Sequence, residues 1–305
     1  MKKLIAAYLS IITVLMMTVT ALADDETRLF YDSVMNLLFE TGNVTLTGHA
    51  EFSLDGERFK TADLSYIQDG TDSFYRLKLL TPRRDGSDGP DRESGYTIIA
   101  NDWKVYVMEV FYPGFYKTGT TRAQDSILRR SVQMDLMTEA VGALADQPEL
   151  LTGGQAITVQ SDGQGGKTLT VALGEDVPAL VNTAVNIFYQ FIAKRYFDTD
   201  YDRVEEQDMA LMENYRTVTQ GILSTTKSVS LKKADVTVRV NGHGVLEQIS
   251  GEAVLLLNTG RDGKKELGIT FSLDVSDIGG SHVDPFDPSA WGVELMEGYA
   301  PFGDE

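Results

Sequence analysis

Cysteine is absent from this sequence, and histidine and proline are scarce, at three and eight of 305 residues. Without cysteine there is no disulfide, no thiolate metal site, no thiol nucleophile and no lipidated cysteine, so stability must come from a packed core. The sequence also lacks the His-Glu-x-x-His, Gly-x-Ser-x-Gly and Walker-loop patterns. We therefore predict no catalytic residue, no bound metal and no cofactor, and we expect a protein that is not an enzyme.

Basic residues are in the minority, because 27 lysines and arginines face 45 aspartates and glutamates and leave a formal net charge of −18. Nucleic acids and anionic membrane surfaces are negatively charged and would repel such a chain. We therefore exclude nucleic acid as a partner. A hydrophobic fraction of 42% is high enough for a folded core and excludes wholesale disorder.

Residues 1–23, MKKLIAAYLSIITVLMMTVTALA, have the order of a secretory signal peptide. Lys2 and Lys3 form a basic start, an apolar stretch follows, and Ala21 and Ala23 make a small-residue cleavage site. We predict an exported protein, extracellular or periplasmic, that is soluble and does not span a membrane once this segment is removed. An uncleaved membrane anchor is the alternative, because the apolar stretch approaches the lower limit for spanning a bilayer.

Alternation of apolar and polar residues predicts a group of antiparallel strands near each end of the chain. In residues 43–54 and 264–277 nearly every second residue is apolar, which is the period of a strand with one dry face and one wet face. Hairpin signals separate such strands at Asp55-Gly56, Asp69-Gly70 and Asn241-Gly242. We interpret the two resulting three-stranded meanders as a loose internal repeat or as a chance recurrence of hairpin signals.

Apolar residues three and four positions apart predict helices in other parts of the chain. These helices cover residues 30–38, 126–144, 176–197 and 205–222. Further hairpins are expected between residues 94 and 115 and between residues 155 and 173, which brings the number of strands to about ten. We assign residues 24–284 to one domain and residues 285–305 to an acidic, aromatic C-terminal tail.

These elements predict an α+β fold: a curled antiparallel β-sheet, or half-barrel, whose concave face is covered by helices. Ten strands at about 4.8 Å span about 48 Å, whereas four helices at about 10 Å cover about 40 Å. The two widths are too close to decide between a residual apolar cleft and a sheet that is fully covered.

The order of the elements resembles the lipoprotein-carrier superfamily, which comprises LolA- and LolB-like proteins and related mycobacterial lipid-carrier lipoproteins. The likeness lies in residues 43–82 and 232–279, notably FSLDGERFKTADLSY and LGITFSLDVSDIGG. In that family an apolar-lined half-barrel capped by helices holds acyl chains, so the resemblance implies this fold and a lipid or acylated protein as partner. The mature chain is longer than the usual carrier and lacks the lipidated cysteine of the anchored members.

The predicted ligand site is the apolar lining of the concave face. Its residues come from the first strand, the long helix at 176–197 and the last long strand: Leu46, Phe52, Leu54, Phe188, Ile192, Leu267, Ile269, Phe271 and Leu273. An acidic segment at residues 198–202 matches the start of an EF-hand loop, but Arg203 and Met209 replace the glycine and glutamate that such a loop requires.

We therefore expect a non-catalytic binding protein that holds a lipid, the acyl chain of a lipoprotein or a partner segment in its concave face. The alternative is an extracellular protein–protein interaction or structural module with a fully self-packed core. An enzyme is the least favoured class, because no convergent polar groups are indicated.

Overall fold

The computed structural model contains a twelve-stranded β-sheet. The residues that it describes are 29–30, 32–34, 36–37, 40–82, 91–101, 104–109, 114–120, 155–174, 177, 179, 181–183, 185–186, 226–260, 263–292 and 294–296. The predicted signal peptide and the predicted helices at 126–144 and 205–222 lie outside these residues, as do Phe188 and Ile192.

Strands account for most of the described chain. In sequence order the elements are β1 (Asn43–Leu54), β2 (Glu57–Asp69), β3 (Asp72–Thr81), β4 (Arg92–Asn101), β5 (Lys104–Glu109), β6 (Gly114–Thr120), β7 (Gln155–Ser161), β8 (Lys167–Leu173), β9 (Ser228–Val240), β10 (Leu246–Asn258), β11 (Lys264–Ser276), the 3-10 helix η3 (Pro288–Trp291) and β12 (Glu294–Met296). Five of the strands, β1, β2, β9, β10 and β11, have 12 or 13 residues, about twice the usual length.

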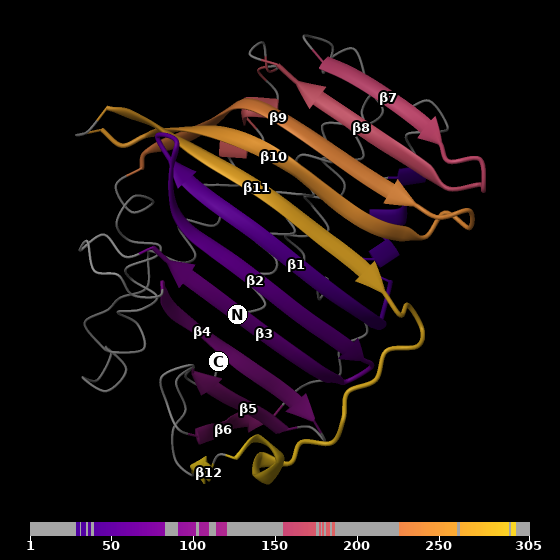
Figure 1. Ribbon diagram of the computed structural model, residues 1–305, viewed down its shortest axis with the longest axis vertical. Coiled ribbons are helices and arrows are strands. Elements are labelled where there is room, and N and C mark those ends of the chain that lie inside the picture. Colours follow the sequence, from indigo (N-terminus) through magenta and orange to yellow (C-terminus); the bar gives the residue numbers. More distant parts are fainter. Residues whose placement is uncertain are drawn as a thin grey trace.

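Two antiparallel meanders meet in the middle of the sheet (Figure 1). The strand order is β12-β6-β5-β4-β3-β2-β1-β11-β10-β9-β8-β7. Strands β1 and β11 come from opposite ends of the chain and pair antiparallel, from Thr45 opposite Ser276 to Leu54 opposite Leu267. The two predicted meanders, β1–β3 and β9–β11, are therefore confirmed, and they lie side by side in one sheet.

The sheet contains two strands more than the predicted ten. The predicted strand between residues 103 and 115 is divided into β5 and β6, and their pairing shifts register between Val105 and Tyr106. Pro113 stands directly before β6, and proline cannot donate a ladder hydrogen bond. Strand β12 comes from the predicted tail and pairs in parallel with β6. Its three residues are too few to show an alternation, so β12 could not be predicted from the pattern of residues.

Strand β9 begins at Ser228, before the stretch at 234–240 that the alternation indicated. Leu231 and Ala234 are both buried, although an odd number of positions separates them. The pairing with β10 shifts register between Val254 and Leu255, which leaves Lys232 as an extra residue in β9. This bulge changes the phase of the pattern, because one inserted residue sends every later side chain to the other face.

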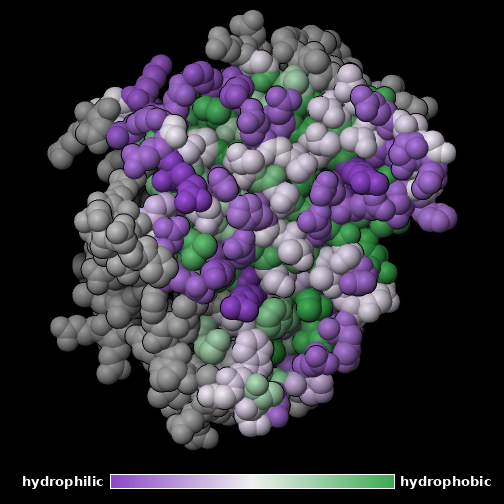
Figure 2. Space-filling model, viewed as in Figure 1, coloured by the Kyte–Doolittle hydropathy of each residue, from purple (hydrophilic) through white to green (hydrophobic). Residues whose placement is uncertain are grey.

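One face of the sheet is apolar, and it carries the main hydrophobic cluster of the described chain. In β1, Val44 and Leu46 point into this cluster, whereas the alternate Thr47 is exposed. Figure 2 shows the other face, where hydrophilic and near-neutral residues cover most of the long strands. We call this second face the outer face.

Helical residues pack against the apolar face. Phe30, Val34 and Leu37, which lie in the first predicted helix, and Val181, which lies in the predicted helix at 176–197, are buried in the same cluster as the strands. Among the described residues, no helix has the length and hydropathy that crossing a bilayer requires.

The C-terminal segment runs past the ends of strands β1 to β4 and reaches the opposite edge of the sheet (Figure 1). Phe286 stacks on Tyr106, with ring centroids 4.1 Å apart, and Trp291 of η3 stacks on Phe74 at 6.3 Å. Tyr106 and the buried Ile99 form a small second cluster, against which Phe74 and Phe286 pack. The described part of the predicted tail is therefore folded onto strands β3 to β6.

Candidate functional site

The apolar face is packed unequally on the two sides of the β1–β11 pair. On β8 to β11, every apolar side chain that belongs to the main cluster is buried, and we call this group the closed flank. A row of opposed residues crosses it: Leu273 opposes Ile249, Ile249 opposes Val238, and Val238 opposes Leu169. Each of the four is at most 1% exposed. The closed flank therefore offers packing and no accessible apolar surface.

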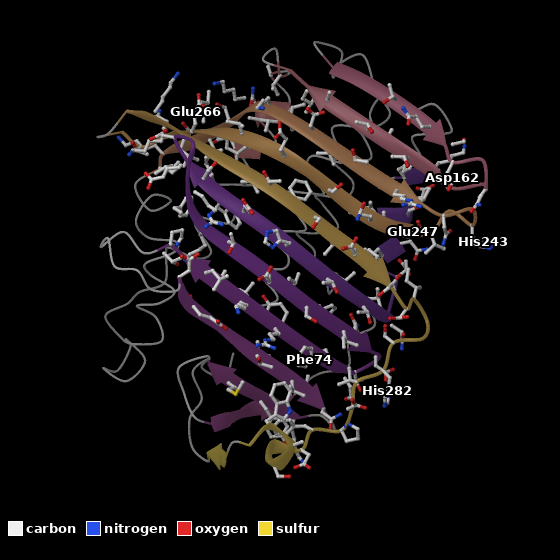
Figure 3. All side chains as sticks on the ribbon, in the orientation of Figure 1. Phe74, Asp162, His243, Glu247, Glu266 and His282 are labelled. Atoms are coloured by element: carbon white, nitrogen blue, oxygen red, sulfur yellow. The ribbon has the colours of Figure 1, made fainter. Side chains whose placement is uncertain are left out.

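On β1 to β4, several apolar side chains pack on the same cluster but remain partly exposed. We call them the half-buried patch: Phe52, Leu54, Phe59, Ala62, Leu64, Leu79 and Ile98. Ala62 opposes Leu79 across the β2–β3 pair, and the rings of Phe52 and Phe59 lie 6.3 Å apart. Leu54 is the last residue of β1, so the patch extends to the β1–β2 turn. Glu266, whose backbone N–H donates to Asp55 of this turn, marks that end of the strands in Figure 3.

A lysine lies on this apolar face, next to a β-bulge in β2. Phe52 opposes Lys60 and Ser53 opposes Arg58, which leaves Phe59 as the extra residue of β2. Directly opposed residues share a face of the sheet, so Lys60 lies on the same side as Phe52. The ring contact between Phe52 and Phe59 places Phe59 there as well. The alternation of β2 therefore places Lys60 among the apolar residues of the half-buried patch, and the bulge adds Phe59 to the same face.

Lys60 is buried, and the described residues supply no partner for it. Its exposed fraction is 6%, and within the described part of the chain it forms neither a hydrogen bond nor an ion pair. Burial lowers the pKa of Lys60 from 10.5 to about 8, because desolvation disfavours the charged form. The side chain is still mostly protonated at neutral pH. A buried charge that lacks a counter-charge is unfavourable, so this lysine is an anomaly in an otherwise apolar surface.

The other buried polar groups of β2 on this face have partners. The hydroxyl of Tyr66 donates to Oε1 of Gln68 at 2.8 Å, and Gln68 is 1% exposed. Burial raises the pKa of Tyr66 well above its usual value, so the hydroxyl stays protonated and remains a donor. The hydroxyl of Tyr66 and the amide of Gln68 thus satisfy each other on this strand, whereas no described residue satisfies Lys60.

The predicted lining residues divide between the two regions. Leu46, Leu267, Ile269, Phe271 and Leu273 are buried in the main cluster, whereas Phe52 and Leu54 belong to the half-buried patch. All seven share one face, since each residue of β1 faces its partner on β11 across the pair. Phe188 and Ile192 lie outside the described residues, so their place in the lining stays a prediction.

Sequence reasoning missed Lys60, although a signal for it was present. Counting back along β2 in steps of two from Tyr66 through Leu64 and Ala62 leads to Lys60. Lys60 therefore follows the alternation that places side chains of β2 on the apolar face. Phe59 does not follow it, and only the bulge explains why Phe59 also packs on the cluster.

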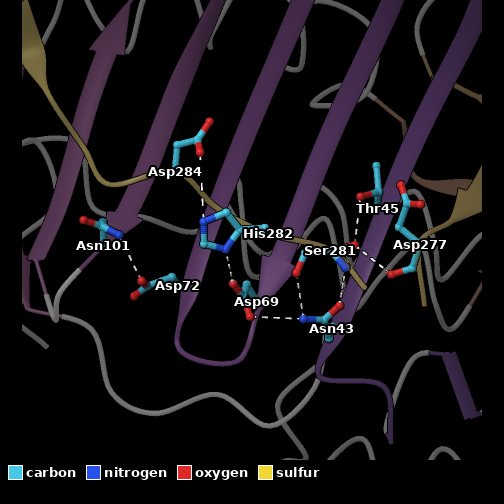
Figure 4. A network of polar contacts seen from close by, with 9 residues as sticks. All are labelled: Asn43, Thr45, Asp69, Asp72, Asn101, Asp277, Ser281, His282 and Asp284. Atoms are coloured by element: carbon cyan, nitrogen blue, oxygen red, sulfur yellow. Dashed lines mark hydrogen bonds and ion pairs between the residues drawn. The ribbon is translucent and has the colours of Figure 1, made fainter. Parts of the chain in front are cut away.

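On the outer face, a polar network fastens the C-terminal segment to β1 and β2 (Figure 4). The amide of Asn43 donates to the carbonyl oxygen of Ser281 at 2.9 Å and to the carboxylate of Asp69 at 3.1 Å, and the backbone N–H of Ser281 donates to Oδ1 of Asn43 at 2.6 Å. Nδ1 of His282 lies 3.1 Å from the carboxylate of Asp69. These contacts hold the C-terminal segment against the start of β1 and the end of β2, before it continues to η3.

His49 is the other polar residue of note on the outer face. Its Nδ1 lies 2.6 Å from the carboxylate of Asp63, and both side chains are about half exposed. That hydrogen bond, with help from Glu51, raises the pKa of His49 above its usual value. Within the described ranges, no group of three or more His, Asp or Glu side chains is placed to hold a metal ion.

Comparison with known proteins gives no family for this chain, because neither a family model nor a curated protein matches it. Among solved structures, the chain is similar to an N-terminal dehydratase from the difficidin assembly line. The two share 8% sequence identity, the alignment covers 76% of this chain and 78% of the other, and the TM-score is 0.13. A TM-score this low carries no argument about fold or activity, so function must be inferred from the sheet itself.

Proposed function

We propose that this protein is an exported, non-catalytic binding protein that holds an apolar or amphipathic ligand against the apolar face of its sheet. The ligand class is a lipid or the acyl chain of a lipoprotein. In this proposal the sheet curls into a half-barrel, the apolar face is its concave side, and the mid-chain helices cover that side. The half-buried patch is the single observation that carries the proposal.

Apolar surface that stays accessible in a folded protein marks a place where another molecule binds. A large apolar side chain gains about 1.5–3 kcal/mol when it passes from full exposure to full burial. An acyl chain that covers the patch would recover part of this energy for each of seven side chains. The resemblance to the lipoprotein carriers favours the same class of ligand.

A second candidate function follows from the closed flank. Its side chains pack like those of a solid interior, which suits a protein–protein interaction or structural module. Binding would then use exposed apolar residues such as Ile278 and Trp291, which are 43% and 40% exposed. The two candidates differ in whether the protein takes up small apolar molecules.

Native mass spectrometry of the chain from residue 24 onward, followed by solvent extraction, separates these candidates. Carriage predicts a stoichiometric lipid in the purified protein, or uptake of a fluorescent fatty acid by the delipidated protein. A lipid-free mass together with no uptake would exclude carriage and leave the interaction module.

A pair of variants tests whether the half-buried patch is the place of binding. Ala62→Trp adds a large side chain in the middle of the patch, and we expect it to abolish uptake of the fluorescent fatty acid. Thr47→Trp adds the same side chain at an exposed position of the outer face and should leave uptake unchanged. Equal uptake by both variants would contradict the assignment of the site, provided that circular dichroism shows both to be folded.

A further inference from the structure

Lys60 poses a question that the proposed function does not answer. An apolar site for a neutral lipid needs no cation, and an isoleucine or methionine at this position would pack without a desolvation cost. The described chain supplies no carboxylate for Lys60, and the shift of its pKa has no cause other than burial. The counter-charge that a buried lysine requires is therefore missing from this part of the protein.

The residues around Lys60 define what could supply that charge. Phe52 lies directly opposite, Phe59 precedes it at the bulge, and Ala62 follows on the same face, so the surroundings are apolar. A group that brought a negative charge to Lys60 would have to be attached to an apolar body in contact with these side chains. An amphiphile has this structure, with one anionic end and a hydrocarbon chain.

We propose that the ligand is an anionic amphiphile whose head group pairs with Nζ of Lys60 while its hydrocarbon chain lies on the half-buried patch. This inference rests on the proposed function and narrows its ligand class. The shared chemistry is a carboxylate, as in a fatty acid, or a phosphate, as in a phospholipid. A lysine suits both, because its ammonium group is a compact charge with three donors.

Pairing with such a head group would supply the counter-charge that the described residues do not offer to Lys60. The anion supplies the missing counter-charge, and the apolar surroundings exclude the water that weakens ion pairs. The hydrocarbon chain alone provides affinity without selecting a head group, since apolar contacts are not directional. Lys60 would therefore control which lipid is held rather than whether a lipid is held.

The test compares three probes with the same hydrocarbon chain on the delipidated protein: palmitate, hexadecyl phosphate and hexadecanol. Binding is measured by displacement of a fluorescent fatty-alcohol analogue, at probe concentrations below those at which the probes aggregate. We expect wild-type protein to bind palmitate or hexadecyl phosphate at least about tenfold more tightly than hexadecanol, corresponding to about 1.4 kcal/mol. Which of the two anions binds more tightly distinguishes a carboxylate from a phosphate head group.

Variants assign the preference to Lys60. Lys60→Met keeps the approximate length and the apolar stem of the side chain. It should reduce the preference for the anionic probes to within about twofold without weakening the binding of hexadecanol. Lys60→Arg keeps the charge and should retain most of the preference. Lys233→Met removes an exposed lysine that is ion-paired with Glu252 on the outer face, and it should change nothing.

The outcomes separate the two proposals. If wild-type protein binds hexadecanol and the anionic probes equally well, or if Lys60→Met keeps the full preference, the head-group inference is wrong and the carrier function stands. If no probe binds and solvent extraction of the purified protein yields no lipid, the carrier function is wrong as well. The wild-type preference is measured without any variant, so the inference is tested even if Lys60→Met does not fold.

Discussion

The closed flank and the half-buried patch lie on the same face of the same sheet, yet they are packed in different ways. On β8 to β11 a row of aliphatic residues is sealed, with Ile249 and Leu273 at most 1% exposed. On β1 to β4 residues such as Leu46 are buried as well, but the residues of the half-buried patch remain partly exposed, and a buried lysine lies among them. Packing alone therefore accounts for the closed flank, whereas the half-buried patch keeps accessible apolar surface.

The contrast also separates two kinds of polar residue. Tyr66 and Gln68 satisfy each other inside the apolar face, as buried polar groups normally do. Lys60 lies on the same strand, and no described residue is such a partner for it. Substitutions in the closed flank, in the half-buried patch and at the C-terminal segment test these contrasts.

The largest effect is expected from removing a sealed side chain. Leu273→Ala should lower the free energy of unfolding by about 3–5 kcal/mol, since it creates a cavity in the closed flank. Leu54→Ala, in the half-buried patch, should cost about 1–2 kcal/mol because part of the side chain is already exposed. Urea unfolding monitored by circular dichroism measures both, and equal losses would remove the distinction between the two regions.

Lys60→Met should act in the opposite direction and stabilise the protein by about 3 kcal/mol at pH 7, because it removes the cost of burying an unpaired charge. The folded-state pKa of about 8 lies below the unfolded value of 10.5, so unfolding takes up a proton between these two values. Wild-type stability should therefore rise relative to the variant as pH increases from 8 to 10.5.

Thermal unfolding of wild-type protein and Lys60→Met at several pH values measures this difference. A difference in stability that stays constant from pH 7 to pH 10.5 would mean that folding does not lower the pKa of Lys60.

Gly251→Ala should destabilise the protein by about 1–3 kcal/mol. A Cβ added at Gly251 in β10 would lie only 2.1 Å from the carbonyl oxygen of Asp235, so β9 would have to move away. Gly48→Ala is the matched control, because its added Cβ would meet its nearest neighbours at 3.4 Å. If urea unfolding shows the same change for both, the close approach of β9 and β10 is not a requirement of the closed flank.

The smallest effect is expected at the C-terminal segment. Trp291→Ala removes the stacking on Phe74, but the tryptophan is 40% exposed, so the loss should be about 0.5–1 kcal/mol. Uptake of the fluorescent fatty acid should not change, since this contact lies on the outer face. A loss of uptake in this variant would link the tail to ligand binding and would favour a different site.

Strands and turns were largely predictable because their signals are local. The alternation in residues 43–54 and 264–277 predicts β1 and β11, and the Asp55-Gly56 signal predicts the turn that joins β1 to β2. Asp55 and Gly56 both have positive φ, 52° and 85°, as a type I′ turn requires. The two bulges were not predictable from the alternation, since an inserted residue is defined only by the partner strand that it fails to match.

The candidate site was predictable in part. Phe52 and Leu54 were assigned to the lining from their parity, and the structure places them on the apolar face. The alternation could not show that these residues stay half exposed while Leu273 is sealed, because both kinds have the same pattern. Exposure depends on what packs over each residue, and that is a property of the whole molecule.

The sequence by itself determined the acidic charge, the lack of disulfides and the long strands with one apolar face, and it predicts an N-terminal signal segment. These follow from composition and from the steric alternation of a single strand. Only the tertiary structure decided that β1 pairs with β11 and that the end of the C-terminal segment packs on the outer face. It also decided that Lys60 is buried where no described residue supplies a counter-charge. Such features depend on contacts between distant parts of the chain, which no local pattern specifies.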